Sequence, residues 1–89
     1  MTALAERFGI AVRQLRIERG WSQGHLAERS DLDRSYVGEI ERGRVVASIV
    51  TAEKLAIALQ VDLATLLMRC QQIDRQREGQ LDRLVAIGR

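Results

Sequence analysis

Apolar residues recur every three or four positions over residues 3–19, which is the spacing of one face of an α-helix. The residues on this face are Leu4, Phe8, Ala11, Val12 and Leu15. The pattern predicts a helix over residues 3–19 that ends at Gly20. Ile10 and Ile17 lie one heptad apart on the opposite face, either as two ordinary exposed isoleucines or as a docking strip for the C-terminal tail or a partner.

Residues 23–43 have the pattern of two short helices joined by a tight turn. The apolar stripes of both helices share a leucine in the turn, and the residues are Leu26, Ala27, Leu32, Val37 and Ile40. Ser22 and Asp33 precede the two helix starts, where a short side-chain oxygen accepts from free backbone amides. The polar residues of the second helix lie off its stripe: Arg34, Ser35, Glu39 and Arg42. A helix that is buried along one edge and polar along the other can contact a partner through its polar edge.

A further helix is predicted over about residues 49–59, with Ser48 as its N-cap. Its inward stripe consists of Ala52, Leu55, Ala56 and Leu59. Val50 and Ile57 form a second stripe, one heptad apart, on another face. Because a helix with two apolar stripes must bury both or associate, the second stripe is a candidate dimer contact.

Asp62 is the expected N-cap of another helix, which starts near Leu63. If that helix continues, heptad a and d positions are occupied by Leu63, Leu66, Cys70, Ile73, Leu84 and Ile87. Gly79 weakens the centre, so the pattern favours a bent or broken tail helix that packs on its own domain or on a partner's. The chain is therefore expected to be all-α with five helices. Residues 1–70 would form the domain, and residues 71–89 a helical extension that is a candidate for dimerisation.

Eighty-nine residues suffice for one small domain with a limited core, which association would help to stabilise. The aromatic residues are Phe8, Trp21 and Tyr36, so the core must be mainly aliphatic. No apolar run approaches the ~20 residues that span a bilayer, and the start lacks a charged-then-apolar signal region. A lone cysteine, Cys70, makes the reducing cytoplasm the expected compartment. The absence of a Cys/His cluster argues against structural zinc.

The net charge of +2 does not by itself establish a nucleic-acid partner. Nearly all of the positive charge is arginine, with Lys54 the sole lysine. Arginine suits fork-shaped recognition of phosphates and guanine edges, but a GC-rich genome produces the same bias. The placement of the charges on the fold must decide.

The residues between Gln23 and Gly43 resemble the phage-repressor-like (Cro/cI, or XRE) helix-turn-helix family. The matching positions are Gln23, Leu26, Ala27, Leu32, Val37, Ile40, Glu41 and Gly43. Residues 32–43 are most similar to the controller proteins of restriction-modification systems, and the resemblance covers about residues 8–67. In two departures, Asp31 stands where the family usually has glycine, and no proline follows Gly43. The first departure is mild because aspartate tolerates left-handed dihedral angles.

The resemblance implies a role for each polar residue of the two short helices. Those in base-contacting positions are Arg34, Ser35 and Glu39, and those in phosphate- or sugar-contacting positions are Gln23, Tyr36, Arg42 and Arg44. Arg34 would bind guanine O6 and N7, whereas Glu39 would either accept from cytosine N4 or orient Arg34. Arg42 has two candidate local partners, Glu39 and Glu41, while Arg44 has none that is evident from the sequence.

Four other residues are expected to be structural or at the surface. By resemblance, Arg16 and Glu41 form a partly buried salt bridge. The family places an apolar core residue at Trp21, so a core position is favoured over stacking on a base. His25, the sole histidine, is expected to be an exposed helix residue and offers neither a catalytic triad nor a metal site.

The first functional hypothesis is a sequence-specific, DNA-binding transcriptional regulator. It would act as a homodimer on a palindromic operator of double-stranded DNA, and the resemblance to controller proteins implies that it could control a restriction-modification operon. The expected dimer contacts are Val50, Ile57, Leu63 and Leu66. The alternative is an antitoxin-like or other protein-interaction module that uses the C-terminal tail. An enzyme is not expected, since no nucleophile–base pair or metal set is visible, and no cofactor, small-molecule ligand or membrane partner is expected either.

Overall fold

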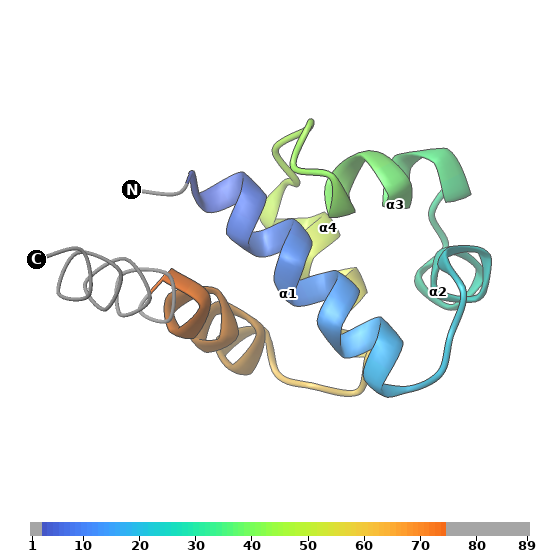
Figure 1. The fold of residues 1–89 in the computed structure, drawn as a ribbon. Coiled ribbons are helices and arrows are strands. Elements are labelled where there is room, and N and C mark those ends of the chain that lie inside the picture. Colours follow the sequence, from blue (N-terminus) through green and yellow to red (C-terminus); the bar gives the residue numbers. More distant parts are fainter. Residues whose placement is uncertain (1–2, 75–89) are drawn as a thin grey trace, which may run out of the picture.

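The computed structural model describes residues 3–74, and this part of the chain is helical without β-strands. The helices are α1 (Leu4–Glu18), α2 (Gln23–Ser30), α3 (Arg34–Glu41) and α4 (Ile49–Ala58), followed by a helical segment over residues 63–74. In Figure 1, α1 crosses in front of α4, α2 and α3 lie together at one end, and segment 63–74, in orange, lies at the other. The all-α, five-helix expectation is confirmed.

Every element contributes to a single aliphatic core. The buried apolar side chains are Phe8, Ala11, Val12, Leu15, Leu26, Ala27, Val37, Ile40, Ala52, Leu55, Ala56, Leu59, Leu66, Cys70 and Ile73. Two expectations for α1 need correction. Leu4 is largely exposed because it lies in the first turn, at the edge of the core, and Ile10 is partly buried and packs against the core. Ile17 is exposed, as the simpler of the two interpretations predicted.

Helices α1–α4 end in the same way, with one residue in or close to the left-handed region. These residues are Gly20, Asp31, Gly43 and Gln60, with φ between 57° and 72°. At each end, two backbone hydrogen bonds close the Schellman motif; after α3 they run from Gly43 N–H to the Ile40 carbonyl and from Arg44 N–H to the Glu39 carbonyl. Asp31 therefore adopts the backbone conformation that its position in the turn demands.

The helix starts follow the sequence prediction at two positions and depart from it at a third. The hydroxyl of Ser22 accepts from His25 N–H at 3.0 Å, and that of Ser48 accepts from Thr51 N–H at 3.1 Å. Asp33 has the extended backbone of an N-cap residue, but its side chain makes no capping hydrogen bond. The Asp33 carbonyl accepts from Val37 N–H, so the backbone alone starts α3.

At Gly9, the backbone of α1 lies directly against the backbone at the end of α3. A Cβ atom at this position would overlap the backbone carbonyl oxygens of Ile40 and Glu41. Any larger residue would push α3 away from α1. Because the C-terminal turn of α3 rests directly on α1, Gly9 helps to set the orientation of α3.

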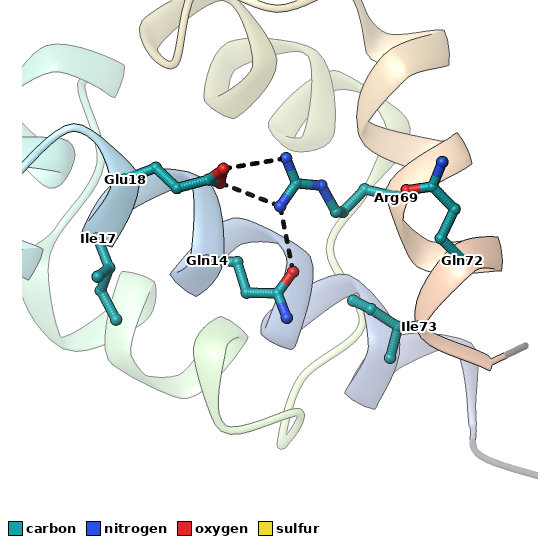
Figure 2. Close-up of a pocket in the computed structure, with 6 residues that line it drawn as sticks. All are labelled: Gln14, Ile17, Glu18, Arg69, Gln72 and Ile73. Atoms are coloured by element: carbon teal, nitrogen blue, oxygen red, sulfur yellow. Dashed lines mark hydrogen bonds and ion pairs between the residues drawn. The ribbon is translucent and has the colours of Figure 1, made fainter. Parts of the chain in front are cut away.

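The segment over residues 63–74 packs on α1. Its inward side chains are Leu66, Cys70 and Ile73. Arg69 donates to both carboxylate oxygens of Glu18, at 3.0 and 3.3 Å, and to Gln14 Oε1 at 3.3 Å (Figure 2). The helix continues through residue 70, and Ile73 belongs to the core, so the described start of the extension is part of the domain. Leu84 and Ile87 lie outside the described residues.

No helix within residues 3–74 is both long and apolar enough to cross a membrane.

Candidate nucleic-acid interface

Helix α3 is buried along one edge and exposed along the other. Val37 and Ile40 are 0 % and 1 % exposed and join the core. Arg34 and Ser35, in its first turn, are both exposed, and Tyr36 is half-buried. The arrangement is the one that the apolar and polar pattern predicts. The first turn of α3 thus presents side chains and free backbone amides to the surroundings.

The first turns of α2 and α3 lie side by side. A Cβ atom added to Gly24 would be 3.8 Å from Cδ of Arg34, so the arginine stem passes over the start of α2. Among the described residues, Arg34 takes part in no ion pair. Its guanidinium is therefore available to a ligand that spans both helix starts.

Glu39 lies between two arginines and does not orient Arg34, which was one of its two candidate roles. Its Oε1 atom is 3.0 Å from Arg42 Nη2 and 3.8 Å from Arg44 Nη1. The guanidinium of Arg42 also lies over Gly38, where an added Cβ atom would be 3.1 Å from Nη2. Of its two candidate partners, Arg42 takes Glu39. Arg44, for which the sequence suggested no partner, lies within ion-pairing distance of the same carboxylate.

Arg16 and Glu41 form a two-pronged salt bridge between α1 and the end of α3. Arg16 Nε donates to Glu41 Oε2 at 2.7 Å, and Arg16 Nη2 donates to Oε1 at 2.9 Å. Arg16 Nη1 also donates to the Trp21 carbonyl at 2.8 Å. The side chains are 12 % and 2 % exposed, and hydrogen bonding to Glu41 raises the pKa of Arg16. The bridge therefore holds α3 to α1.

Gln23 joins this network from the first turn of α2. Its Nε2 atom donates to Glu41 Oε1 at 3.1 Å. The backbone amide of Gln23 lies at the N-terminus of α2, where the helix dipole favours an anion. The side chain thus has a structural contact that the sequence did not suggest, in addition to the position expected for a phosphate contact.

The ring of Trp21 packs against His25 and Arg29 at the surface of α2, an arrangement that was not predicted from the sequence. The ring of Trp21 lies 4.7 Å from the ring of His25, and Arg29 Cζ lies 5.0 Å from the centre of the Trp21 ring. The spacing of four residues between these three positions was the available signal. Trp21 is partly buried against the core, as expected, but its ring also packs under two exposed side chains of α2.

The residues expected at the dimer interface separate into a surface set and a core residue. Val50 and Ile57 are 61 % and 69 % exposed, and Leu63 is partly buried. Leu66 is 0 % exposed. A side chain without accessible surface cannot contact a second chain. Leu66 therefore belongs to the core, and its predicted place in the dimer interface is wrong.

An apolar groove lies between the first half of α1, the segment that precedes α4 and the start of α4. It has a volume of about 370 Å³ and is lined by Leu4, Ala5, Phe8, Val45, Val46, Ala47, Ile49, Ala52 and Leu67. Val46 and Ile49 are among the most exposed large apolar residues that the structure describes. The groove and the Val50/Ile57 stripe together leave apolar surface uncovered along α4.

Within residues 3–74, no group of three or more His, Cys, Asp or Glu side chains is arranged to hold a metal ion.

Comparison with known proteins identifies a family. Residues 12–66 match the helix-turn-helix family designated HTH_3. A hypothetical transcription factor of Neisseria meningitidis is 41 % identical over 68 % of this chain and 58 % of its own length. The chain thus spans less than two thirds of that relative.

Two solved controller proteins of restriction-modification systems share the fold. C.AhdI from Aeromonas hydrophila has a TM-score of 0.68 at 47 % identity, covering 70 % of this chain and 94 % of its own. C.Esp1396I, solved as a tetramer with its natural 35 base-pair operator, has a TM-score of 0.74 at 26 % identity, covering 81 % and 95 %. From the family match and these likenesses, the chain belongs to the XRE-type helix-turn-helix family of transcriptional regulators.

Proposed function

We propose that this chain is a sequence-specific DNA-binding regulator of transcription that acts as a homodimer on a palindromic operator. The observation that carries the proposal is the geometry of α3, which is clamped by Val37, Ile40 and Glu41 and leaves Arg34 and Ser35 exposed. A helix has the right width for the major groove of B-DNA, where each base pair presents a distinct set of donors and acceptors. The DNA complex of C.Esp1396I supports the same partner for this chain.

Base recognition is assigned to the first turn of α3. Arg34 is exposed, unpaired among the described residues and long enough to bind guanine O6 and N7 with two hydrogen bonds. The hydroxyl of Ser35 can donate to or accept from a neighbouring base edge. In helix-turn-helix proteins the start of the second helix enters the groove, which matches the positions of these two residues.

Contacts to the DNA backbone are assigned to the start of α2, to Tyr36 within α3 and to the residues that follow α3. The amide at the start of α2, at Gln23, would bind one phosphate, and Tyr36 would contact a phosphate or sugar next to the bases. Arg42 and Arg44 follow at the other end of α3, and both are exposed. Phosphate groups on either side of the groove would thereby fix the register of α3.

The proposed dimer surface consists of Val50, Ile57 and Leu63, with the apolar groove beside Ile49 as its extension. One module of this size covers a short half-site and binds weakly alone. Two-fold dimers place two recognition helices about 34 Å apart, one turn of DNA. Binding would then depend steeply on protein concentration, which suits the control of a restriction-modification operon in the cytoplasm.

Selection of bound duplexes from a random pool tests the proposal. The expected product is a pair of inverted half-sites separated by about one helical turn, bound by two chains as measured by the mass of the complex in solution. Recovery of sequences without a shared motif would contradict sequence-specific binding. A single chain on the selected duplex would contradict the homodimer.

A further inference from the structure

Glu39 is a carboxylate on the helix that is proposed to enter negatively charged DNA. Its Oε1 atom lies 3.0 Å from Arg42 Nη2 and 3.8 Å from Arg44 Nη1, and both arginines are proposed phosphate contacts. The three side chains together carry a charge of +1 instead of the +2 that the arginines alone would present. The carboxylate therefore lowers the positive potential at the C-terminal end of α3.

The backbone of the turn after α3 places Arg44 in this cluster. Gly43 has φ of +72°, and the Schellman motif joins Arg44 N–H to the Glu39 carbonyl at 3.0 Å. Residues 39 and 44 are thereby fixed next to each other by main-chain hydrogen bonds. Arg42 reaches Glu39 from one turn along the same helix. The cluster is thus built by α3 and its C-terminal turn.

The ion pairs are weak enough to be exchanged. Glu39 is 36 % exposed, and Arg42 and Arg44 are 48 % and 65 % exposed, so solvent screens each pair. A phosphate could replace the carboxylate as the partner of either arginine. The carboxylate would then be left near phosphates unless it found a donor of its own.

Amino groups in the major groove provide such a donor. Cytosine N4 and adenine N6 each donate there, whereas guanine and thymine present acceptors. Arg34, by contrast, needs no release, because it is not paired within the described residues. Arg34 therefore differs from Arg42 and Arg44, which follow α3, in being free of an ion pair before DNA binds.

On the basis of the proposed function, we propose that Glu39 is a specificity-determining residue that restrains Arg42 and Arg44 on arbitrary DNA. Where the sequence places a cytosine or adenine amino group beside Glu39, the carboxylate accepts from it and both arginines are released to phosphates. Where no amino group is present, the arginines stay partly neutralised. Discrimination then comes from weakened binding to wrong sequences as well as from a favourable contact to the right one.

The experiment compares wild type with Glu39→Gln on a mixed-sequence duplex of about 30 base pairs, over a salt series. Glutamine keeps the size of the side chain and removes its charge. The expected result is about three- to tenfold tighter binding by Glu39→Gln, since two surface ion pairs are lost. The dependence of log K on log salt should also steepen by about one to two, because each released arginine can neutralise one more phosphate.

Two controls separate this restraint from a general change of charge. Glu28→Gln removes one exposed carboxylate from α2 that is in no ion pair among the described residues, and it should change the affinity less than twofold. Glu39→Gln in an Arg42→Ala/Arg44→Ala background should give no gain. Equal melting temperatures of wild type and Glu39→Gln, monitored by circular dichroism, would show that the fold is unchanged.

The same variants on the duplex selected by wild type complete the test. Glu39→Gln should lower the ratio of selected to mixed-sequence affinity, mainly by strengthening mixed-sequence binding. A lower ratio with mixed-sequence affinity unchanged would overturn the restraint and leave Glu39 as a base contact alone. A gain that persists without Arg42 and Arg44, or is matched by Glu28→Gln, would also overturn it. Failure to select any motif would instead count against the proposed function, while the mixed-sequence comparison would still decide the role of Glu39.

Discussion

Nε of Arg16 lies 2.7 Å from Oε2 of Glu41, so the last turn of α3 is tied to α1. The same carboxylate accepts from Gln23 at the start of α2, and the same guanidinium donates to the Trp21 carbonyl. One nearly buried bridge thereby links α1, α2, α3 and the α1–α2 turn. The orientation of α3, and with it the direction in which Arg34 points, depends on this network.

Removing one partner of the bridge should be strongly destabilising. Arg16→Ala leaves the 2 % exposed Glu41 side chain without its cation, and we expect a loss of ~3–5 kcal/mol in the free energy of unfolding. Urea denaturation measures it. Arg13→Ala, at an exposed position of the same helix, should change stability by less than about 0.5 kcal/mol. A loss under about 1 kcal/mol for Arg16→Ala would contradict a structural role for the bridge.

Gly9→Ala should destabilise the chain by about 1–3 kcal/mol, because the new methyl group would meet the backbone carbonyl oxygens of α3. Gly24→Ala is the matched control, since its Cβ atom would lie 3.8 Å from Arg34 Cδ and from Ser22 Oγ, an ordinary van der Waals distance. Alanine in α2 should stabilise by up to about 1 kcal/mol. Thermal melting of both variants would reveal opposite signs, and two shifts of the same sign would refute the close approach of α1 and α3.

Asp31→Gly should stabilise the fold by about 0.5–1 kcal/mol. Asp31 has φ of 57° and ψ of 46°, a left-handed conformation that glycine adopts without the steric penalty of a Cβ atom. Part of the gain is offset because glycine has more freedom in the unfolded chain. Chemical denaturation of the variant measures the difference, and a clear loss of stability would show that the Asp31 side chain has another role.

The stability of the chain should fall as the pH rises past about 8.5, the ordinary pKa of cysteine. Burial raises the pKa of the Cys70 thiol, so the folded state favours the protonated form. A pKa that is raised on folding contributes stability below its unfolded value, and this contribution is lost as the pH rises through the folded value. The urea midpoint at pH 7 and pH 10 should therefore differ more for wild type than for Cys70→Ala. Equal differences would mean that Cys70 titrates as it does in the unfolded chain.

Sequence patterns predicted the helices because each one has a stripe of apolar residues at helical spacing. The helix predicted at about 49–59 is observed at Ile49–Ala58, and the one predicted at 3–19 is observed at Leu4–Glu18. Leu4 and Ile10 were misplaced because periodicity gives the face of a residue but not where the neighbouring helices end. The close contact at Gly9 has no periodic signal, since it depends on how two helices cross.

The candidate site was only partly accessible from sequence. Resemblance identified the bridge between Arg16 and Glu41, and the polar edge of α3 followed from its apolar stripe. The partner of Arg44 was missed because the left-handed turn at Gly43 reverses the chain and returns residue 44 to Glu39. Leu66 fitted a heptad position, but that pattern does not distinguish a core contact within one chain from a contact between two.

The central claim is that Arg34 reads a base from the exposed edge of α3, and affinity measurements on two duplexes test it most directly. Arg34→Ala should reduce the difference in binding free energy between the selected and the scrambled duplex by ~1–3 kcal/mol per half-site, with thermal stability unchanged. Arg44→Ala, in contrast, should weaken both duplexes, the selected one more because Arg44 is released to a phosphate there, and should reduce the salt slope on the selected duplex by about one. An Arg34→Ala protein that discriminates between the two duplexes as well as wild type does would contradict the account.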